Sequence, residues 1–169
     1  MKLDAARSRL AVYTFAEGLF SALAHDLELV AAELSGSHTD TSAEVRVAVG
    51  GLGVSGVMKK GKIDKDLLSS GDVVTIERQI HEELFHGAKE IVARGTLEGR
   101  RASIEVTAPR GTTRVACDLE VTTEGEAKRA RGQVEVSLAA LGLPPVKGPL
   151  GAFRVKDRVR VEIDLVFVP

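Results

Sequence analysis

Four histidines are the first residues to consider for chemistry, because a metal site in a protein needs at least three ligands that converge on one point. They are His25, His38, His81 and His86. His81 and His86 are five positions apart, which is about 140° around a helix, so their rings would not share a face. His38 lies in a predicted turn. The sequence therefore predicts no metal site.

Ser21 and His25 form the one pair that could support nucleophilic catalysis, since residues four apart on a helix are neighbours. No acid that could orient the histidine accompanies them, and no oxyanion-binding loop follows. Cys117 alternates in phase with Val115 and Leu119, which is typical of a small buried core residue rather than an activated thiol. We therefore expect no catalytic residues and no enzymatic activity.

The segment GLGVSG, from Gly51 to Gly56, matches the dinucleotide-binding fingerprint letter for letter. That fingerprint requires a helix that begins directly behind the glycines and presents its N-terminus to the pyrophosphate. Here VMKKGKIDKD follows, with another glycine and no apolar helical stripe. Turn or bulge glycines are expected instead, and no cofactor is predicted.

The length of the chain suits a single domain that spans residues 1–169. Because 23 lysines and arginines face 24 aspartates and glutamates, no strong overall field favours a nucleic-acid partner. Charges are scattered through the N-terminal segment, where a signal peptide needs an unbroken apolar stretch, and no apolar run approaches the length of a membrane span. We expect no stable membrane insertion and a cytoplasmic location, or a periplasmic one only if a leader precedes this sequence.

Much of the chain alternates between polar and apolar residues, which is the pattern of a strand with one wet face and one dry face. The clearest run is 158–167, and similar runs occur at 42–49, 101–107, 113–121 and 131–138. Turn-forming residues bound each run, as expected for successive antiparallel strands. The sequence therefore predicts a mostly β protein.

One segment, residues 70–87, has helical periodicity instead. Its apolar stripe consists of Val73, Ile76, Ile80 and Leu84. Ser70 or Asp72 is expected to cap its start and Gly87 to end it. Shorter helical turns are predicted in EGLFSALAH and in SLAALGL.

An antiparallel sheet that is dry on one face needs a second sheet, a covering helix or closure on itself. One or two helices cannot cover this many strands. A sandwich and a closed barrel both remain, because both bury every second residue.

Four segments resemble the YceI-like family. GLPPVKGPLGAFRVKDRVRVEIDL is similar to its C-terminal loop, VKD turn and last strand, and DVVTIERQIHEELFHGAKEIVARG to its helix that runs into a strand. TAPRGTTRVACDLEV resembles its strand, turn and strand, and RSRLAVYTFAEGLFSALAHDLEL its opening strand and histidine-bearing turn. The segments follow the family's order over nearly the whole chain. Ala88 and Lys89 stand where the family commonly has Tyr-Pro, and tryptophan is absent.

The resemblance implies an all-β fold: a closed antiparallel lipocalin-like barrel with one or two short helices. It also implies that the lumen binds a long isoprenoid chain, such as a quinone tail, or a similar fatty ligand, without catalysis. A homodimer is expected from the resemblance alone. The residues agree with a lumen, because an inward set rich in valine, alanine and leucine leaves room in a barrel of about eight strands.

Two functions follow from these patterns. The first is binding or carriage of a long apolar, lipid-type ligand inside the barrel. The second is a filled barrel that acts as a structural or protein-interaction module, with the same side chains packed into a solid core.

The two functions differ over whether the residues expected to face the lumen enclose an elongated apolar cavity. These are His25, Leu27, Leu29, Val45, Val47, Ile104, Val134, Val136, Phe153, Val159, Val161 and Ile163. His25 is included because it alternates in phase with Leu27 and Leu29, which leaves Glu28 on the wet face. Phe153 is expected to act as a plug or gate. The last strand is expected to close the barrel against the first.

Overall fold

The structure is a computed structural model of the chain, and it describes residues 1–18, 24–147 and 154–169. Within these residues, eight strands form a closed antiparallel ring. In ring order they are β1 (Lys2–Leu3), β5 (Leu34–His38), β6 (Ser42–Ala48), β9 (Glu90–Glu98), β10 (Arg101–Ala108), β11 (Gly111–Glu124), β12 (Ala127–Ser137) and β14 (Arg158–Val168). The predicted closed barrel is therefore confirmed.

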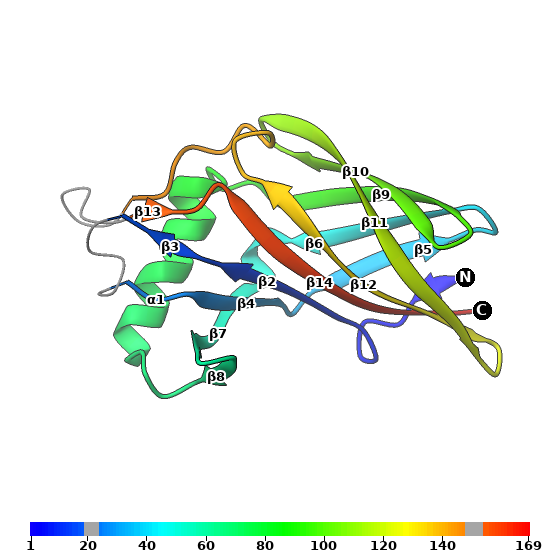
Figure 1. The fold of residues 1–169 in the computed structure, drawn as a ribbon, viewed down its shortest axis with the longest axis horizontal. Coiled ribbons are helices and arrows are strands. Elements are labelled where there is room, and N and C mark those ends of the chain that lie inside the picture. The colour runs from blue at the N-terminus through cyan, green and yellow to red at the C-terminus, as the bar shows by residue number, and fades with distance from the viewer. Residues whose placement is uncertain (19–23, 148–153) are drawn as a thin grey trace.

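Four further strands extend the sheet beyond this ring from the part of the β14 edge that β1 does not reach. They are β2 (Arg9–Thr14), β4 (Leu27–Ala31), β7 (Leu52–Lys59) and β8 (Lys62–Asp64). A separate two-stranded sheet pairs β3 (Ala16–Glu17) with β13 (Arg154–Val155). The barrel is elongated, with the helix across one end and both chain termini at the other (Figure 1). We call these the helical end and the far end.

The last strand, β14, closes the barrel as the sequence predicts. One of its edges pairs with β12, where Val161 lies opposite Val134. Its other edge pairs with β2, where Val161 lies opposite Val12, and then with β1, where Phe167 lies opposite Leu3. Because strand side chains alternate between faces, the apolar residues at every second position from Val159 to Phe167 point inward and the charged residues of the strand point outward.

The helix α1 (Ser70–Arg78) continues into a π-helical turn, η3 (Gln79–Leu84). Its N-cap is Ser69, one residue before the predicted cap: the Asp72 amide donates to Ser69 Oγ, and Asp72 Oδ2 accepts from the Ser69 amide, both at 3.1 Å. His86 and Gly87 adopt positive φ angles of 50° and 68° and end the helix. Glycine has no side chain that opposes a positive φ angle, which explains why Gly87 follows the last turn.

The other two predicted helical turns have different outcomes. In SLAALGL, residues 138–142 form hydrogen-bonded turns and no helix, because Asp157 Oδ1 and Ser137 Oγ accept from the amides of Ala139 and Ala140 and hold a tight loop. EGLFSALAH falls largely on residues 19–23, outside the described residues.

The glycines of GLGVSG lie in a short 3-10 turn and a bulged strand, as predicted. Glu28 lies opposite Gly56 while Leu29 lies opposite Val54, so Ser55 is the extra residue of a β-bulge. A Cβ at Gly56 would lie 2.6 Å from the carbonyl oxygen of Asp64, so only glycine fits there. No helix begins behind these glycines to receive a pyrophosphate.

Two further sequence predictions concern the core and the membrane. Cys117 is buried, and burial raises the pKa of its thiol, which fits a core residue. Within the residues that the structure describes, no helix has both the length and the apolar character needed to span a bilayer.

Candidate functional site

The barrel encloses a cavity of about 610 Å³, a volume within the usual range of small-molecule sites. Aliphatic side chains from β2, β4, β6, β9, β10, β11, β12 and β14 line most of it, and α1 with η3 covers one end. An apolar cavity of this kind favours an apolar ligand, because its walls offer few hydrogen-bond partners.

Ten of the residues predicted to face the lumen line this cavity. They are Leu27, Leu29, Val45, Val47, Ile104, Val134, Val136, Val159, Val161 and Ile163. The period-two pattern alone assigned these side chains to the inner face, because a regular strand places every second residue there. Phe153, the predicted plug, lies outside the described residues.

The prediction for His25 is wrong. β4 begins only at Leu27, so the alternation of that strand does not extend back to His25, which is exposed and does not line the cavity. Its imidazole lies near the start of α1: hydrogen bonds from Ser69 lower the pKa of Asp72, and the nearby His25 adds to this effect.

The inward aliphatic side chains around the middle of the barrel are incompletely buried. On β2, the inward Leu10 and Val12 are half-buried, whereas the outward Ala11 and Tyr13 are only 0% and 7% exposed. In a filled barrel the inward side chains would be the more buried set. The side chains of the barrel therefore leave part of its interior empty.

The helical end of the cavity is closed by apolar residues. Ile76, Ile80 and Leu84 of α1 and η3 line it, together with Leu141 and Leu143 of the loop after β12. The sequence left open whether this helical stripe covers an opening or pads the outside, and the structure places it on the cavity. None of the residues of α1 or η3 is fully buried.

Polar contacts hold the helix against the edge of β7. Glu77 Oε1 accepts from the Val54 amide at 2.8 Å, and His81 Nε2 donates to the Leu52 carbonyl at 2.9 Å. These backbone groups lie on the part of β7 that β8 does not reach, because β8 pairs only from Val57 onward. The two side chains therefore satisfy a strand edge that would otherwise be open.

The far end of the cavity is polar. His38 ends β5, and its ring lies 5.4 Å from the ring of Phe167. Lys128 of β12 is in phase with the inward residues Ala130 and Val134. Burial, followed by the positive charges of Lys128 and the N-terminus, lowers the pKa of His38, although Asp40 acts in the opposite direction.

The sequence prediction missed this polar end for identifiable reasons. It placed His38 in a turn, whereas the residue is the last of a strand. It began the β12 alternation at residue 131, but the strand starts at Ala127, and counting back in steps of two from Val134 reaches Lys128. The signal for Lys128 was therefore present in the sequence.

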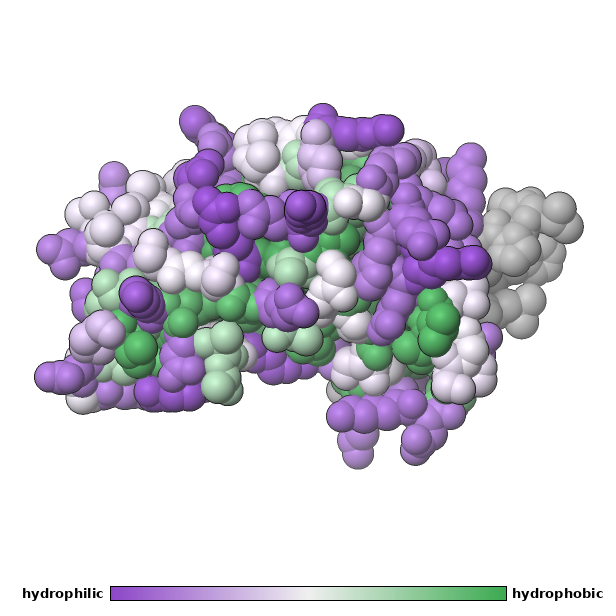
Figure 2. Space-filling model, turned by 180° about the vertical axis from the view of Figure 1, so that it is seen from behind, coloured by the Kyte–Doolittle hydropathy of each residue, from purple (hydrophilic) through white to green (hydrophobic). Residues whose placement is uncertain are grey.

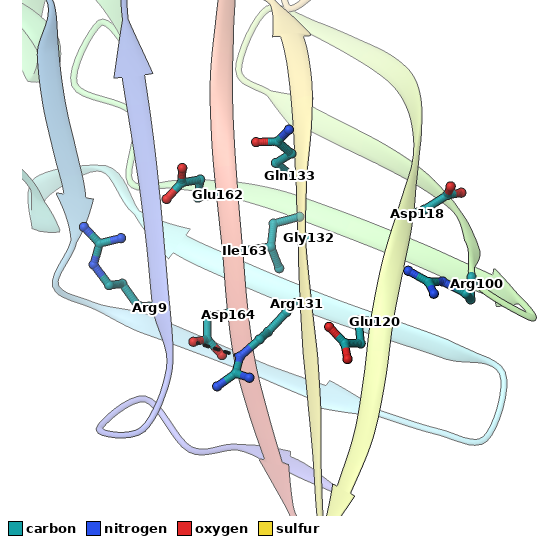
Figure 3. Close-up of a pocket in the computed structure, with 10 residues that line it drawn as sticks. All are labelled: Arg9, Arg100, Asp118, Glu120, Arg131, Gly132, Gln133, Glu162, Ile163 and Asp164. Atoms are coloured by element: carbon teal, nitrogen blue, oxygen red, sulfur yellow. Dashed lines mark ion pairs between the residues drawn. The ribbon is translucent and has the colours of Figure 1, made fainter. Parts of the chain in front are cut away.

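A second hollow, of about 630 Å³, lies on the outer face of β2, β14, β12 and β11. Figure 3 shows acidic and basic side chains interspersed over it, with Arg131 turned toward Asp164. Arg131 Nε lies 3.5 Å from Asp164 Oδ2, and Arg129 donates twice to the same carboxylate at 2.6 and 2.8 Å. These pairings are typical of a solvated sheet surface, so the inner cavity is the better candidate site.

One buried polar cluster lies beside this outer hollow. Glu28 is on the wet face, as predicted, but it is only 4% exposed. The Tyr13 hydroxyl donates to its Oε2 at 2.6 Å and Arg9 at 2.8 Å. Burial raises the pKa of Glu28, but hydrogen bonds from Tyr13, Ser55 and Arg9 outweigh it, so that its pKa is lowered overall.

The same cluster changes the acidity of Tyr13. Burial and the hydrogen bond to Glu28 raise the pKa of Tyr13 to about 12, and the Arg160 guanidinium lies 4.6 Å from the centre of its ring. The cluster therefore links β14, β2 and β4 on the outside of the barrel.

Among the described residues, no group of three histidine, cysteine, aspartate or glutamate side chains is placed to hold a metal ion.

Comparison with known proteins supports the fold. No model of a known protein family matches the chain, and no curated protein matches its sequence. The chain is similar to the crystal structure of Burkholderia cenocepacia BcnA, with a TM-score of 0.67 and 13% identity, over 98% of this chain and 99% of that one. At this identity the likeness shows the fold alone, which is a lipocalin-like barrel.

Proposed function

We propose that this protein binds a long apolar chain inside its barrel and carries it without catalysis. The observation that carries the proposal is the half-buried state of inward aliphatic side chains such as Val12, Val161 and Ile163 around a cavity of about 610 Å³. A ligand chain would cover this apolar surface, and each methylene that it buries contributes about 0.8 kcal/mol. A few isoprene units or a fatty chain would therefore offset the cost of association.

We further propose that the chain is a member of the YceI-like family. The order of the four resembling segments and the lipocalin-like barrel support this assignment. An isoprenoid, a quinone-like tail and a fatty chain are the ligand classes that this membership and the apolar walls favour together.

Native mass spectrometry of protein purified without detergent tests the proposal. A stoichiometric apolar adduct, identified after solvent extraction, is the expected result. A protein that stays at its apo mass, also after incubation with quinones and polyprenyl chains, would instead favour a filled barrel and a protein partner.

A fluorescence titration provides an independent test. The chain contains no tryptophan, so a hydrophobic fluorophore can be excited near 295 nm through one introduced indole, as in Val12→Trp. We expect energy transfer from this indole to the fluorophore. A chain without absorbance, such as hexadecanol, should also shift the emission of the indole in Val12→Trp and leave unchanged that of a control indole at the outward Ser103, which is exposed on β10.

A further inference from the structure

The two ends of the cavity differ in polarity. At the helical end most of the lining side chains are apolar, including Ile80, Leu84 and Leu143, with Gln79, Glu83 and Lys147 as polar exceptions. At the far end the lining includes His38, Asp40, Thr41, Ser42 and Lys128. A purely hydrocarbon ligand gains nothing from this asymmetry, whereas a ligand with one polar end does.

Lys128 is the residue at the far end that is placed to bind a charged group. It lies opposite Phe167 and Thr123 on the inner face of β12, and it is half-buried. It forms no ion pair within 4.0 Å with any residue that the structure describes, whereas Arg129 beside it is held by Asp164. An inward ammonium group without a carboxylate partner favours an anion.

The groups around Lys128 add positive charge and hydrogen-bond donors rather than negative charge. The N-terminal ammonium group of Met1 donates to the His38 carbonyl at 3.0 Å, so a second positive charge lies at this end. His38 itself supplies an imidazole beside Phe167. Asp40 is the one acidic side chain among the described residues of the cavity lining at this end.

From this arrangement we infer that the ligand is amphipathic, with an anionic head, a carboxylate or a phosphate, bound by Lys128 and His38 at the far end and its chain directed toward α1. The inference rests on the proposed function and names the ligand class of the same site. From Val159 to Phe167 the inner face of β14 spans roughly 26 Å at about 3.3 Å per residue, which is room for a long extended chain.

The opposite end also has a lysine, Lys147, but its setting differs. Lys147 is exposed in the loop before β13, and the other charged residue of the lining at that end is the acidic Glu83. Water screens an exposed lysine more strongly than a half-buried one. Lys147 therefore serves as the matched control.

The test compares the binding of hexadecanoate and hexadecanol, which have chains of equal length and differ in the charge of the head. Calorimetric titrations use the wild-type protein, Lys128→Met and Lys147→Met. We expect Lys128→Met to weaken hexadecanoate binding about tenfold and to leave hexadecanol binding unchanged. Lys147→Met tests the reverse orientation of the ligand, and in this variant hexadecanoate and hexadecanol should keep the ratio of affinities that they have in the wild type. Hexadecyl phosphate, as a third probe, decides between a carboxylate and a phosphate head by which of the two anions binds more tightly.

Each other outcome has a distinct meaning. Equal losses for both ligands in Lys128→Met, or a selective loss of hexadecanoate in Lys147→Met, would overturn the assignment of the head to the far end. If neither chain binds to the wild-type protein, the proposed function itself fails.

The ring of His38 provides a spectroscopic readout that a merely structural role of Lys128 would not produce. An anion bound beside the ring favours its protonated form. The pKa of His38, followed by NMR, should therefore rise with bound hexadecanoate and not with bound hexadecanol. Equal values in the two complexes would contradict the inference.

Discussion

At the scale of single residues, Glu28 shows how an outward side chain can become part of the core. It lies on the wet face of β4, yet Tyr13 and Arg9 cover it and donate to it. A buried carboxylate of this kind needs its donors, because a buried charge without them is costly. The cluster therefore specifies how β2 lies against β4.

Replacement of Glu28 is the first prediction at this scale. Glu28→Gln should lower the free energy of unfolding by about 2 kcal/mol, because it weakens charge-assisted hydrogen bonds in a buried position. The matched control is Glu105→Gln, which removes a solvent-exposed pair with Arg114 and should cost less than about 0.5 kcal/mol. Urea denaturation followed by circular dichroism measures both. Equal effects in the two variants would show that the cluster adds nothing beyond a surface pair.

The second prediction concerns the pH dependence that Glu28 confers. Because its pKa is lower in the folded protein than in the unfolded chain, its contribution to stability is complete above the unfolded value of about 4.3. This contribution is lost as the pH falls through the folded value. The difference in unfolding free energy between the wild type and Glu28→Gln should therefore shrink below about pH 4.3. Urea titrations between pH 7 and pH 3 test this, and a difference that grows on acidification would contradict it.

At the scale of elements, α1 and η3 are held by two polar contacts to β7 and by partly buried residues such as Ile80 and Leu84. Glu77 and His81 bind the edge of β7, while no residue of the helix is fully buried. Segments with few buried apolar contacts open at a lower free energy than the whole protein unfolds. The helical end is thus the least stable cover of the cavity.

A third prediction follows for Glu77. Glu77→Ala should speed amide hydrogen exchange in α1 and η3 and raise the dissociation rate of a bound chain, while global stability falls by less than about 1 kcal/mol. The control is Glu82→Ala on the exposed face of η3, which should leave both rates unchanged. Exchange that increases across the whole barrel would mean that the helix supports the entire fold.

At the scale of the whole molecule, hydrophobic residues are not confined to the interior. Seen from behind, they form an irregular band between hydrophilic residues (Figure 2). Of the large hydrophobic side chains that the structure describes, Leu67, Val74 and Val121 are the exposed ones, and Val121 also lines the cavity. The barrel therefore leaves apolar surface uncovered both inside and outside.

The fourth prediction tests whether the interior is empty. Val161→Phe places extra volume in the middle of the cavity, where the native side chain is half-buried, so stability should stay the same or rise by up to about 1 kcal/mol. Val49→Phe adds the same volume where the native side chain is only 1% exposed and does not line the cavity, and overpacking there should cost about 1–3 kcal/mol.

Urea denaturation and binding of a hydrophobic fluorophore measure the two variants. Val161→Phe should also reduce fluorophore binding, because the added ring occupies the site. If Val161→Phe destabilises the protein as much as Val49→Phe does, the barrel is filled.

The sequence by itself determined the strand faces. The alternation in β14 and β12 identified inward residues such as Val134, Val161 and Ile163, because the direction of a strand side chain depends only on its position in a period of two. Closure of the barrel did not follow from alternation, which suits a sandwich equally well. It was predicted only through the family resemblance.

Tertiary structure decided everything that depends on partners remote in sequence. In the tertiary structure His25 lies off the inner face of the barrel and Glu28 is buried on the outer face. Lys128 lies beside His38 at the far end. The tertiary structure also left the middle of the barrel unfilled, because the space inside depends on how many strands pair and with what stagger. These properties arise from hydrogen bonds between strands as far apart as β1 and β14, which no local pattern encodes.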